Sequence, residues 1–68
     1  MQFKRYIVNT IDQNKLRAIF GADHEFSIVK QSKMSNKTIV SIRIEQRVNV
    51  DYANELNVDI TPTNKYYF

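Results

Sequence analysis

The chain has 68 residues and no cysteine, and ten Lys and Arg residues against seven Asp and Glu give it a formal charge of +3. A chain of this length forms one small domain, residues 1–68, which buries only about 60% of the surface of its unfolded chain, so we expect no deep active site. The lack of cysteine excludes a disulfide framework and favours the cytoplasm. No apolar run approaches the ~20 residues of a membrane span, so we expect no membrane segment.

The first predicted element is a strand over residues 2–9. Both faces of this strand are partly apolar, which is typical of a strand inside a sheet that is covered on one side and carries an aromatic residue on the other. We assign Ile7 to the covered face and Tyr6 to the open face. The alternation places Phe3, Arg5 and Ile7 on one face and Lys4, Tyr6 and Val8 on the other.

A helix is predicted over residues 11–20. Thr10 and Gln13 match a capping box, in which the Thr10 hydroxyl accepts from the Gln13 amide. Gly21 supplies the left-handed conformation that ends many helices. Apolar residues recur at the spacing of one helix face, at Leu16, Ile19 and Phe20.

Two further strands are predicted at residues 25–31 and 38–48, joined by a polar turn over residues 33–37. The stretch 38–48 alternates β-branched apolar residues with polar ones, so we place it at the centre of the sheet. Pairing Ile28 opposite Ile42 keeps the apolar residues of both strands on one face. The same register sets Phe26 opposite Ile44, Ser32 opposite Thr38, and Glu25 opposite Glu45 as a like-charge pair.

A second helix is predicted after residue 49, where Asn49 or Asp51 can cap its start and Asn57 can end it. Tyr52, Ala53 and Leu56 share its apolar face. The helix is barely two turns long, so packing against the sheet must hold it.

The tail, residues 58–68, is predicted to be a strand interrupted by Pro62. Proline cannot donate to a strand ladder, so it belongs on a sheet edge or at a turn. The alternative is a β-turn over residues 61–64 between two very short strands, 58–60 and 65–68.

The order strand, helix, strand, strand, helix, strand is that of the ferredoxin-like fold. We therefore predict an α+β fold with a four-stranded antiparallel sheet and two helices on one face. The first and third strands lie at the centre of such a sheet, and the second and fourth at its edges. The predicted core contains Ile7, Leu16, Ile19, Phe20, Phe26, Ile28, Val40, Ile42, Ile44 and Leu56.

Residue types that carry catalysis are scarce. His24 is the single histidine, and its carboxylate neighbours Asp23 and Glu25 point in diverging directions because the three residues are consecutive. One glycine excludes a glycine-rich phosphate loop, and the serines have no base other than His24. We expect a protein that is not an enzyme and that holds neither a metal nor a cofactor.

The stretch from Arg5 to Asn9 resembles the first-strand motif of RNA-recognition-motif domains. In that family an exposed aromatic residue stacks on a base, so the resemblance implies base stacking by Tyr6. The second motif of the family, a stretch rich in basic residues, glycine and aromatic residues, has no counterpart in residues 38–48, and Glu45 lies between two of the nearby cations. The residues that would neutralise phosphate are Lys4, Arg43 and Arg47.

We predict a small regulator or inhibitor that binds a host or partner protein through a sheet edge or the aromatic C-terminus, with basic residues steering it toward an acidic surface. Abundant residues with AT-rich codons favour a low-GC bacterium, its phages or another mobile element as the source. The alternative is a nucleic-acid-binding protein that uses the open sheet face. Exposed edge strands also permit a homodimer. The candidate binding residues are Lys4, Tyr6, Lys33, Lys37, Arg43, Arg47, Tyr66, Tyr67 and Phe68.

Overall fold

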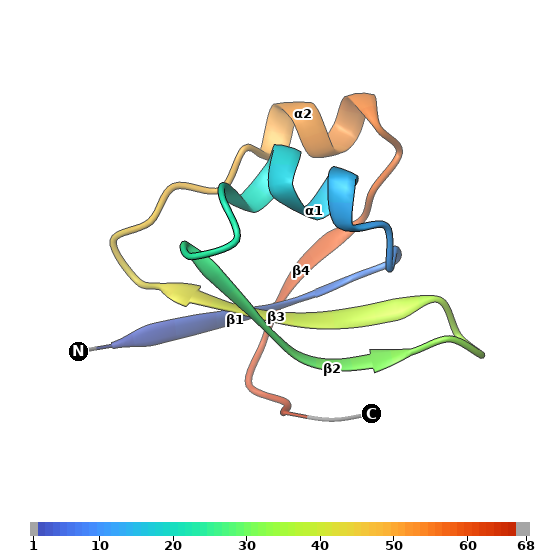
Figure 1. Cartoon of the computed structure of the whole chain (residues 1–68), viewed down its shortest axis with the longest axis horizontal. Helices are drawn as coiled ribbons and strands as arrows, with labels where there is room; N and C mark the ends of the chain where they lie inside the picture. The colour runs from blue at the N-terminus through green and yellow to red at the C-terminus, as the bar shows by residue number, and fades with distance from the viewer. Residues whose placement is uncertain (1, 67–68) are drawn as a thin grey trace.

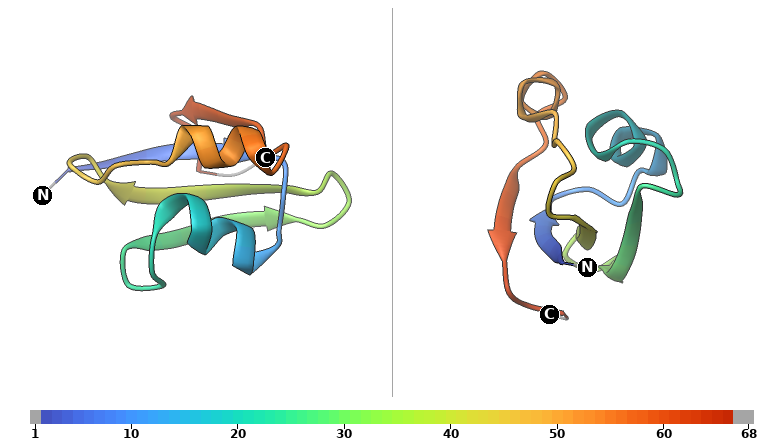
Figure 2. Two further views of the ribbon diagram at one scale, coloured as in Figure 1. Left: turned by 90° about the horizontal axis from the view of Figure 1, so that it is seen from above. Right: turned by 90° about the vertical axis from the view of Figure 1, so that its left-hand side faces the viewer.

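A computed structural model describes residues 2–66 of the chain (Figure 1). Its elements follow in the order β1 (Phe3–Val8), α1 (Gln13–Phe20), β2 (Phe26–Ser32), β3 (Lys37–Arg43), α2 (Val50–Glu55) and β4 (Ile60–Thr63). The strands form one antiparallel sheet in the order β2-β3-β1-β4. Both helices lie on the same side of this sheet (Figure 2). The predicted α+β fold with a four-stranded antiparallel sheet and two helices is confirmed.

The hydrophobic core lies between the helices and the sheet face that they cover, which we call the inner face. The backbone N–H of Asn49 donates to the carbonyl of Ile19 at 3.0 Å and joins the start of α2 to the end of α1. Tyr6, Ile28, Val48, Leu56 and Ile60 pack around the core in partly buried positions. The buried core residues are Val8, Leu16, Ile19, Phe20, Phe26, Val40, Ile42, Ala53 and Val58.

The two faces of β1 are the reverse of the prediction. Tyr6 pairs with Val40 on the inner face, and its ring centroid lies 6.0 Å from that of Phe20. Ile7 pairs with Ile39 on the opposite face, which we call the outer face. The alternation in β1 alone could not decide between two faces of similar apolarity. The partner strand decided, because it directs Val40 and Ile42 toward the helices.

The strand β3 ends at Arg43, well before the predicted end at residue 48. A turn follows, in which the N–H of Gln46 donates to the carbonyl of Arg43 at 3.0 Å. Ile44 lies in this turn and is 52% exposed, so its assignment to the core was wrong. The polar run after Ile44 leaves the sheet because the chain must turn there toward α2.

The hairpin of β2 and β3 is confirmed, but its register differs from the prediction. Phe26 lies opposite Ile42, and Ile28 lies opposite Val40. The predicted and the observed register both keep the apolar residues on one face, so the pattern alone could not choose between them. The turn ends at Asn36, whose φ is 53°, and an irregularity between Ile28 and Lys30 shifts the pairing further. The predicted pairs of Phe26 with Ile44, Ser32 with Thr38 and Glu25 with Glu45 do not form.

The start of α1 also differs from the prediction, since Asp12 caps it in place of Thr10. An Asp12 side-chain oxygen accepts from the N–H of Asn14 at 2.9 Å. The Thr10 hydroxyl accepts instead from the N–H of Asp12 at 3.1 Å, and the Thr10 carbonyl accepts from the buried hydroxyl of Thr38 at 2.6 Å. The sheet therefore holds Thr10, and the helix begins later at Gln13.

Three other residues that begin or end a helix lie where the sequence predicted them. Gly21 ends α1 with a φ of 108°, Asn49 caps α2 by accepting from the N–H of Tyr52 at 3.1 Å, and Asn57 ends that helix with a φ of 57°. Pro62 lies in the edge strand β4, opposite Tyr6. The alternative prediction of a β-turn over residues 61–64 was therefore wrong.

Candidate binding surface

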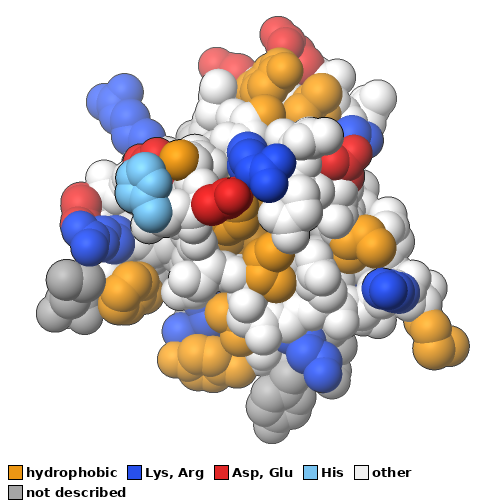
Figure 3. All heavy atoms as spheres, in the orientation of Figure 1, with side chains coloured by type: hydrophobic (Ala, Val, Ile, Leu, Met, Phe, Trp, Pro, Cys, Tyr) orange, Lys and Arg blue, Asp and Glu red, His pale blue; other side chains and the backbone are white. Residues whose placement is uncertain are grey.

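Every charged side chain on the four strands is basic. All seven Asp and Glu residues lie in loops or in α2, and no strand contains one. The strands carry Lys4, Arg5, Lys30, Lys37 and Arg43. Figure 3 accordingly shows no acidic side chain over the lower part of the molecule, where the sheet lies.

Four of these five cations lie on the outer face of the sheet. Ile39 pairs with both Ile7 and Lys30 and marks that face at the centre. Ile39 is fully buried although it does not belong to the core cluster. The cations around it on the same face are Arg5, Lys30, Lys37 and Arg43.

The chain that follows β4 passes beneath the outer face (Figure 1). The Arg5 guanidinium lies 3.8 Å from the centroid of the Tyr66 ring, and one of its nitrogens donates to the carbonyl of Asn64 at 3.1 Å. The Nε of Arg5 is buried without a hydrogen-bond partner. Tyr66 and Phe3 remain 58% and 53% exposed, so two aromatic side chains accompany the outer-face cations.

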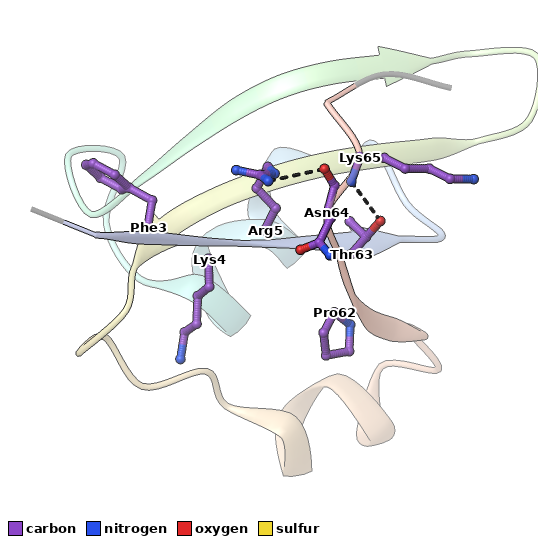
Figure 4. Close-up of a pocket in the computed structure, with 7 residues that line it drawn as sticks. All are labelled: Phe3, Lys4, Arg5, Pro62, Thr63, Asn64 and Lys65. Atoms are coloured by element: carbon purple, nitrogen blue, oxygen red, sulfur yellow. Dashed lines mark hydrogen bonds between the residues drawn. The ribbon is translucent and has the colours of Figure 1, made fainter.

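A hollow of about 590 Å³ lies where β4 leaves β1 (Figure 4), and we call it the notch. It exists because β4 pairs with β1 only as far as Arg5 opposite Thr63, whereas β1 begins at Phe3. Figure 4 shows Phe3 and Arg5 on one side of the sheet and Lys4 and Pro62 on the other. The notch is lined by Phe3, Lys4, Arg5, Pro62, Thr63, Asn64 and Lys65, which include three cations and no carboxylate.

The predicted binding residues do not form one site. Lys37 and Arg43 lie on the outer face, and Lys33 lies in the hairpin turn that precedes Lys37. Lys4 lines the notch, whereas Arg47 lines a separate hollow of about 420 Å³ in the loop before α2. Tyr66 lies under Arg5. Tyr67 and Phe68 lie outside the described residues.

The base-stacking role of Tyr6 depended on the assignment of this residue to the open face of the sheet, which was wrong. Tyr6 is half-buried against the core, and the Lys4 ammonium lies 5.8 Å from its ring centroid. Because the Tyr6 ring packs near Phe20 on the inner side of the sheet, it is not on the outer face, where a base could stack on it. Four residues of the surface were missed by the sequence reasoning, namely Phe3, Arg5, Lys30 and Lys65. Phe3 and Arg5 share the face of Ile7, so a correct assignment of Ile7 would have found them.

The acidic loop before β2 holds structural contacts. Asp23 pairs with the Nε of Arg17 at 2.8 Å, and Glu25 accepts from the N–H of Ala22 and from the Gln46 amide, both at 3.0 Å. These two hydrogen bonds, the backbone one above all, lower the pKa of Glu25. Asp23 and Glu25 thus reach different partners on either side of the exposed His24. Among residues 2–66 no group of His, Cys, Asp or Glu side chains gathers closely enough to hold a metal ion.

Comparison with family models, with curated proteins and with solved structures found no match for this chain. Within the described part of the chain, no helix has the length and apolarity that crossing a membrane requires. The outer face and the notch are therefore the features of the molecule that bear on its function.

Proposed function

We propose that this chain is a small non-enzymatic regulator or inhibitor that binds an acidic surface of a partner protein through the outer face of its sheet. The observation that carries the proposal is the set of four strand cations, Arg5, Lys30, Lys37 and Arg43, on a face whose strands contain no carboxylate. Positive charges on a rigid sheet, without negative charges among them, attract an acidic partner and disfavour a basic one.

The aromatic side chains support a contact role for the same face. Binding energy in protein interfaces is concentrated in a few aromatic and arginine side chains. Phe3 and Tyr66 are more than half exposed, and Arg5 is already ordered by its stack on Tyr66. Pre-ordering of this kind reduces the conformational entropy that binding costs.

We also propose the ferredoxin-like topology for this chain. The order of the elements supports it, as does the placement of β1 and β3 between β2 and β4. The chain is rich in residues that AT-rich codons encode, which supports a phage or another mobile element of a low-GC bacterium as the source. With such a source, the proposed partner is a protein of the bacterial host, and the proposed location is the cytoplasm.

Affinity capture from a nuclease-treated lysate of a low-GC bacterium tests the proposed function. The outer-face variant is Lys37→Glu, and the matched control is Lys15→Glu on α1, which changes the net charge equally. We expect a partner that the wild type and the control retain and that the outer-face variant loses. Equal capture by both variants would exclude the outer face as the binding surface.

A second candidate function is binding of single-stranded nucleic acid by the same face. The specific observation is that Arg5 stacks on the exposed Tyr66 and shares its face with the exposed Phe3, while Glu45 lies in the turn after β3. Stacking on aromatic rings and neutralisation of phosphate are the two contributions that such binding needs. Titration with oligothymidylate at two salt concentrations tests it. Tight, salt-sensitive binding that Tyr66→Ala weakens would favour this function over a protein partner.

A further inference from the structure

We propose that the notch binds an extended acidic segment of a protein, which continues the sheet along β1 where β4 has left it. The inference rests on the proposed function and names the chemistry of the partner at one end of the binding surface. Addition of a strand to an exposed sheet edge is a recurring way of recognising peptides.

The backbone of β1 offers free hydrogen-bonding groups in the notch. The carbonyl of Gln2 accepts from the N–H of Ile44 at 3.1 Å and therefore faces β3. Successive residues of a strand direct their N–H and C=O groups to opposite neighbours, so those of Phe3 point away from β3 into the notch. β4 reaches only as far as Arg5, and it leaves these two groups of Phe3 unpaired. They are available to an added strand.

The chain after β4 is held clear of this position. The N–H of Lys65 donates to the Thr63 hydroxyl at 3.1 Å, and Arg5 donates to the carbonyl of Asn64 (Figure 4). These two bonds direct the chain toward the outer face rather than along β1. The resulting hollow of about 590 Å³ has room for several residues of an extended segment.

The charges of the notch select an acidic segment. Lys4 points to the inner side of the sheet and Arg5 to the outer side, whereas the Lys65 side chain extends away from both (Figure 4). Neighbouring side chains of an added strand also point to opposite sides. Two consecutive carboxylates of the segment therefore meet Lys4 and Arg5, one on each side.

The same geometry disfavours a nucleic acid in the notch. A single strand of nucleic acid lying on the outer face brings its phosphates to Arg5 but not to Lys4, which is on the other side of the sheet. Its bases offer no regular partner to the N–H and C=O of Phe3. A peptide satisfies both the backbone edge and the two opposed cations, so we assign the notch to a peptide.

The experiment titrates the ¹⁵N-labelled full chain with the peptide acetyl-Thr-Val-Glu-Asp-Val-Thr-amide and follows backbone amide shifts. We expect saturable shifts at residues 2–5 and 63–65. Lys4→Glu should raise the dissociation constant about tenfold, because charge reversal replaces an attraction with a repulsion. The matched control Lys15→Glu on α1 makes the same charge change and should leave the affinity unchanged.

A second variant tests the backbone contact separately from charge. Phe3→Pro removes the N–H that faces the notch and no donor that faces β3, and proline is tolerated at the start of a strand. We expect it to weaken peptide binding, whereas Phe3→Thr, which keeps the N–H, should bind more tightly than Phe3→Pro. Unchanged spectra outside residues 2–5 show that the sheet of each variant is intact.

Several outcomes would overturn the proposal. They are the absence of shifts at residues 2–5, equal affinity for the peptide with Gln and Asn in place of Glu and Asp, and the same shifts with oligothymidylate. A dimer in sedimentation that the peptide dissociates would identify a second copy as the occupant. Shifts confined to Lys30 and Lys37 would reject the notch but leave the outer face as binding surface. Loss of the proposed function itself appears separately, as equal capture by the outer-face and control variants.

Discussion

The two faces of the sheet differ in what their side chains do. On the inner face Val8, Val40 and Ile42 are almost completely buried beneath the helices. On the outer face only Ile39 is buried, with Ile7 beside it, and basic side chains surround this small apolar centre. Strand alternation thus lets one set of strands build the core with one half of its residues and a charged surface with the other half. Stability and binding should therefore respond to different substitutions.

The largest expected effect tests the inner face. Ile42→Ala should lower the free energy of unfolding by about 2 to 5 kcal/mol, because it removes a fully buried side chain and leaves a cavity. This is a large fraction of the stability of a small domain. Urea denaturation measures the loss. The control Ile44→Ala, in the exposed turn after β3, should change stability by no more than about 0.5 kcal/mol. Similar losses for both variants would show that β3 continues into the core beyond Arg43.

The second prediction concerns a polar side chain on the inner face. The buried Thr38 hydroxyl donates to the carbonyl of Thr10, so Thr38→Val keeps the side-chain shape but leaves that carbonyl without its donor. We expect a loss of about 1 to 3 kcal/mol in urea denaturation. Thr61→Val, on an exposed position of β4, is the control and should change stability little. A neutral Thr38→Val would mean that another donor replaces the hydroxyl.

The third prediction concerns pH and the loop that leads into β2. The backbone hydrogen bond from Ala22, with that from Gln46, lowers the pKa of Glu25 below its ordinary value of 4.5. A lowered folded-state pKa stabilises the fold above the unfolded pKa, and this contribution is lost as the pH falls through the folded pKa. Glu25→Gln should therefore lose less stability than the wild type between pH 7 and pH 3. Glu55→Gln on α2 is the control, and an equal loss in the wild type and Glu25→Gln would contradict the assignment.

The smallest expected effect on stability tests the outer face. Lys37→Glu places an acidic side chain on an exposed position of the cationic face and should change the free energy of unfolding by no more than about 0.5 kcal/mol. The same variant should weaken capture of the partner, because it adds repulsion toward an acidic surface. Comparison with Lys15→Glu separates this local effect from net charge. A large loss of stability would show that the outer face also holds the fold together.

The sequence alone determined the features that local interactions control. The period of the apolar residues identified the strands and helices in their order, and Gly21, Asn49 and Asn57 marked helix ends because their backbone and side-chain chemistry acts within a few residues. The turn before β3 and the edge position of Pro62 follow from similarly local rules. Of the predicted binding residues, Lys37 and Arg43 share the outer face, and Lys4 lines the notch.

Only the tertiary structure decided which face of β1 became the inner one, where β3 ends and how it pairs with β2. These choices depend on partners far away in the sequence, since Tyr6 is placed by Val40 and Phe20, and several registers satisfy the same local pattern. The surface is a consequence of the same choices. Once Ile7 turned outward, Arg5 and Phe3 turned with it, and the early departure of β4 from β1 opened the notch beside them.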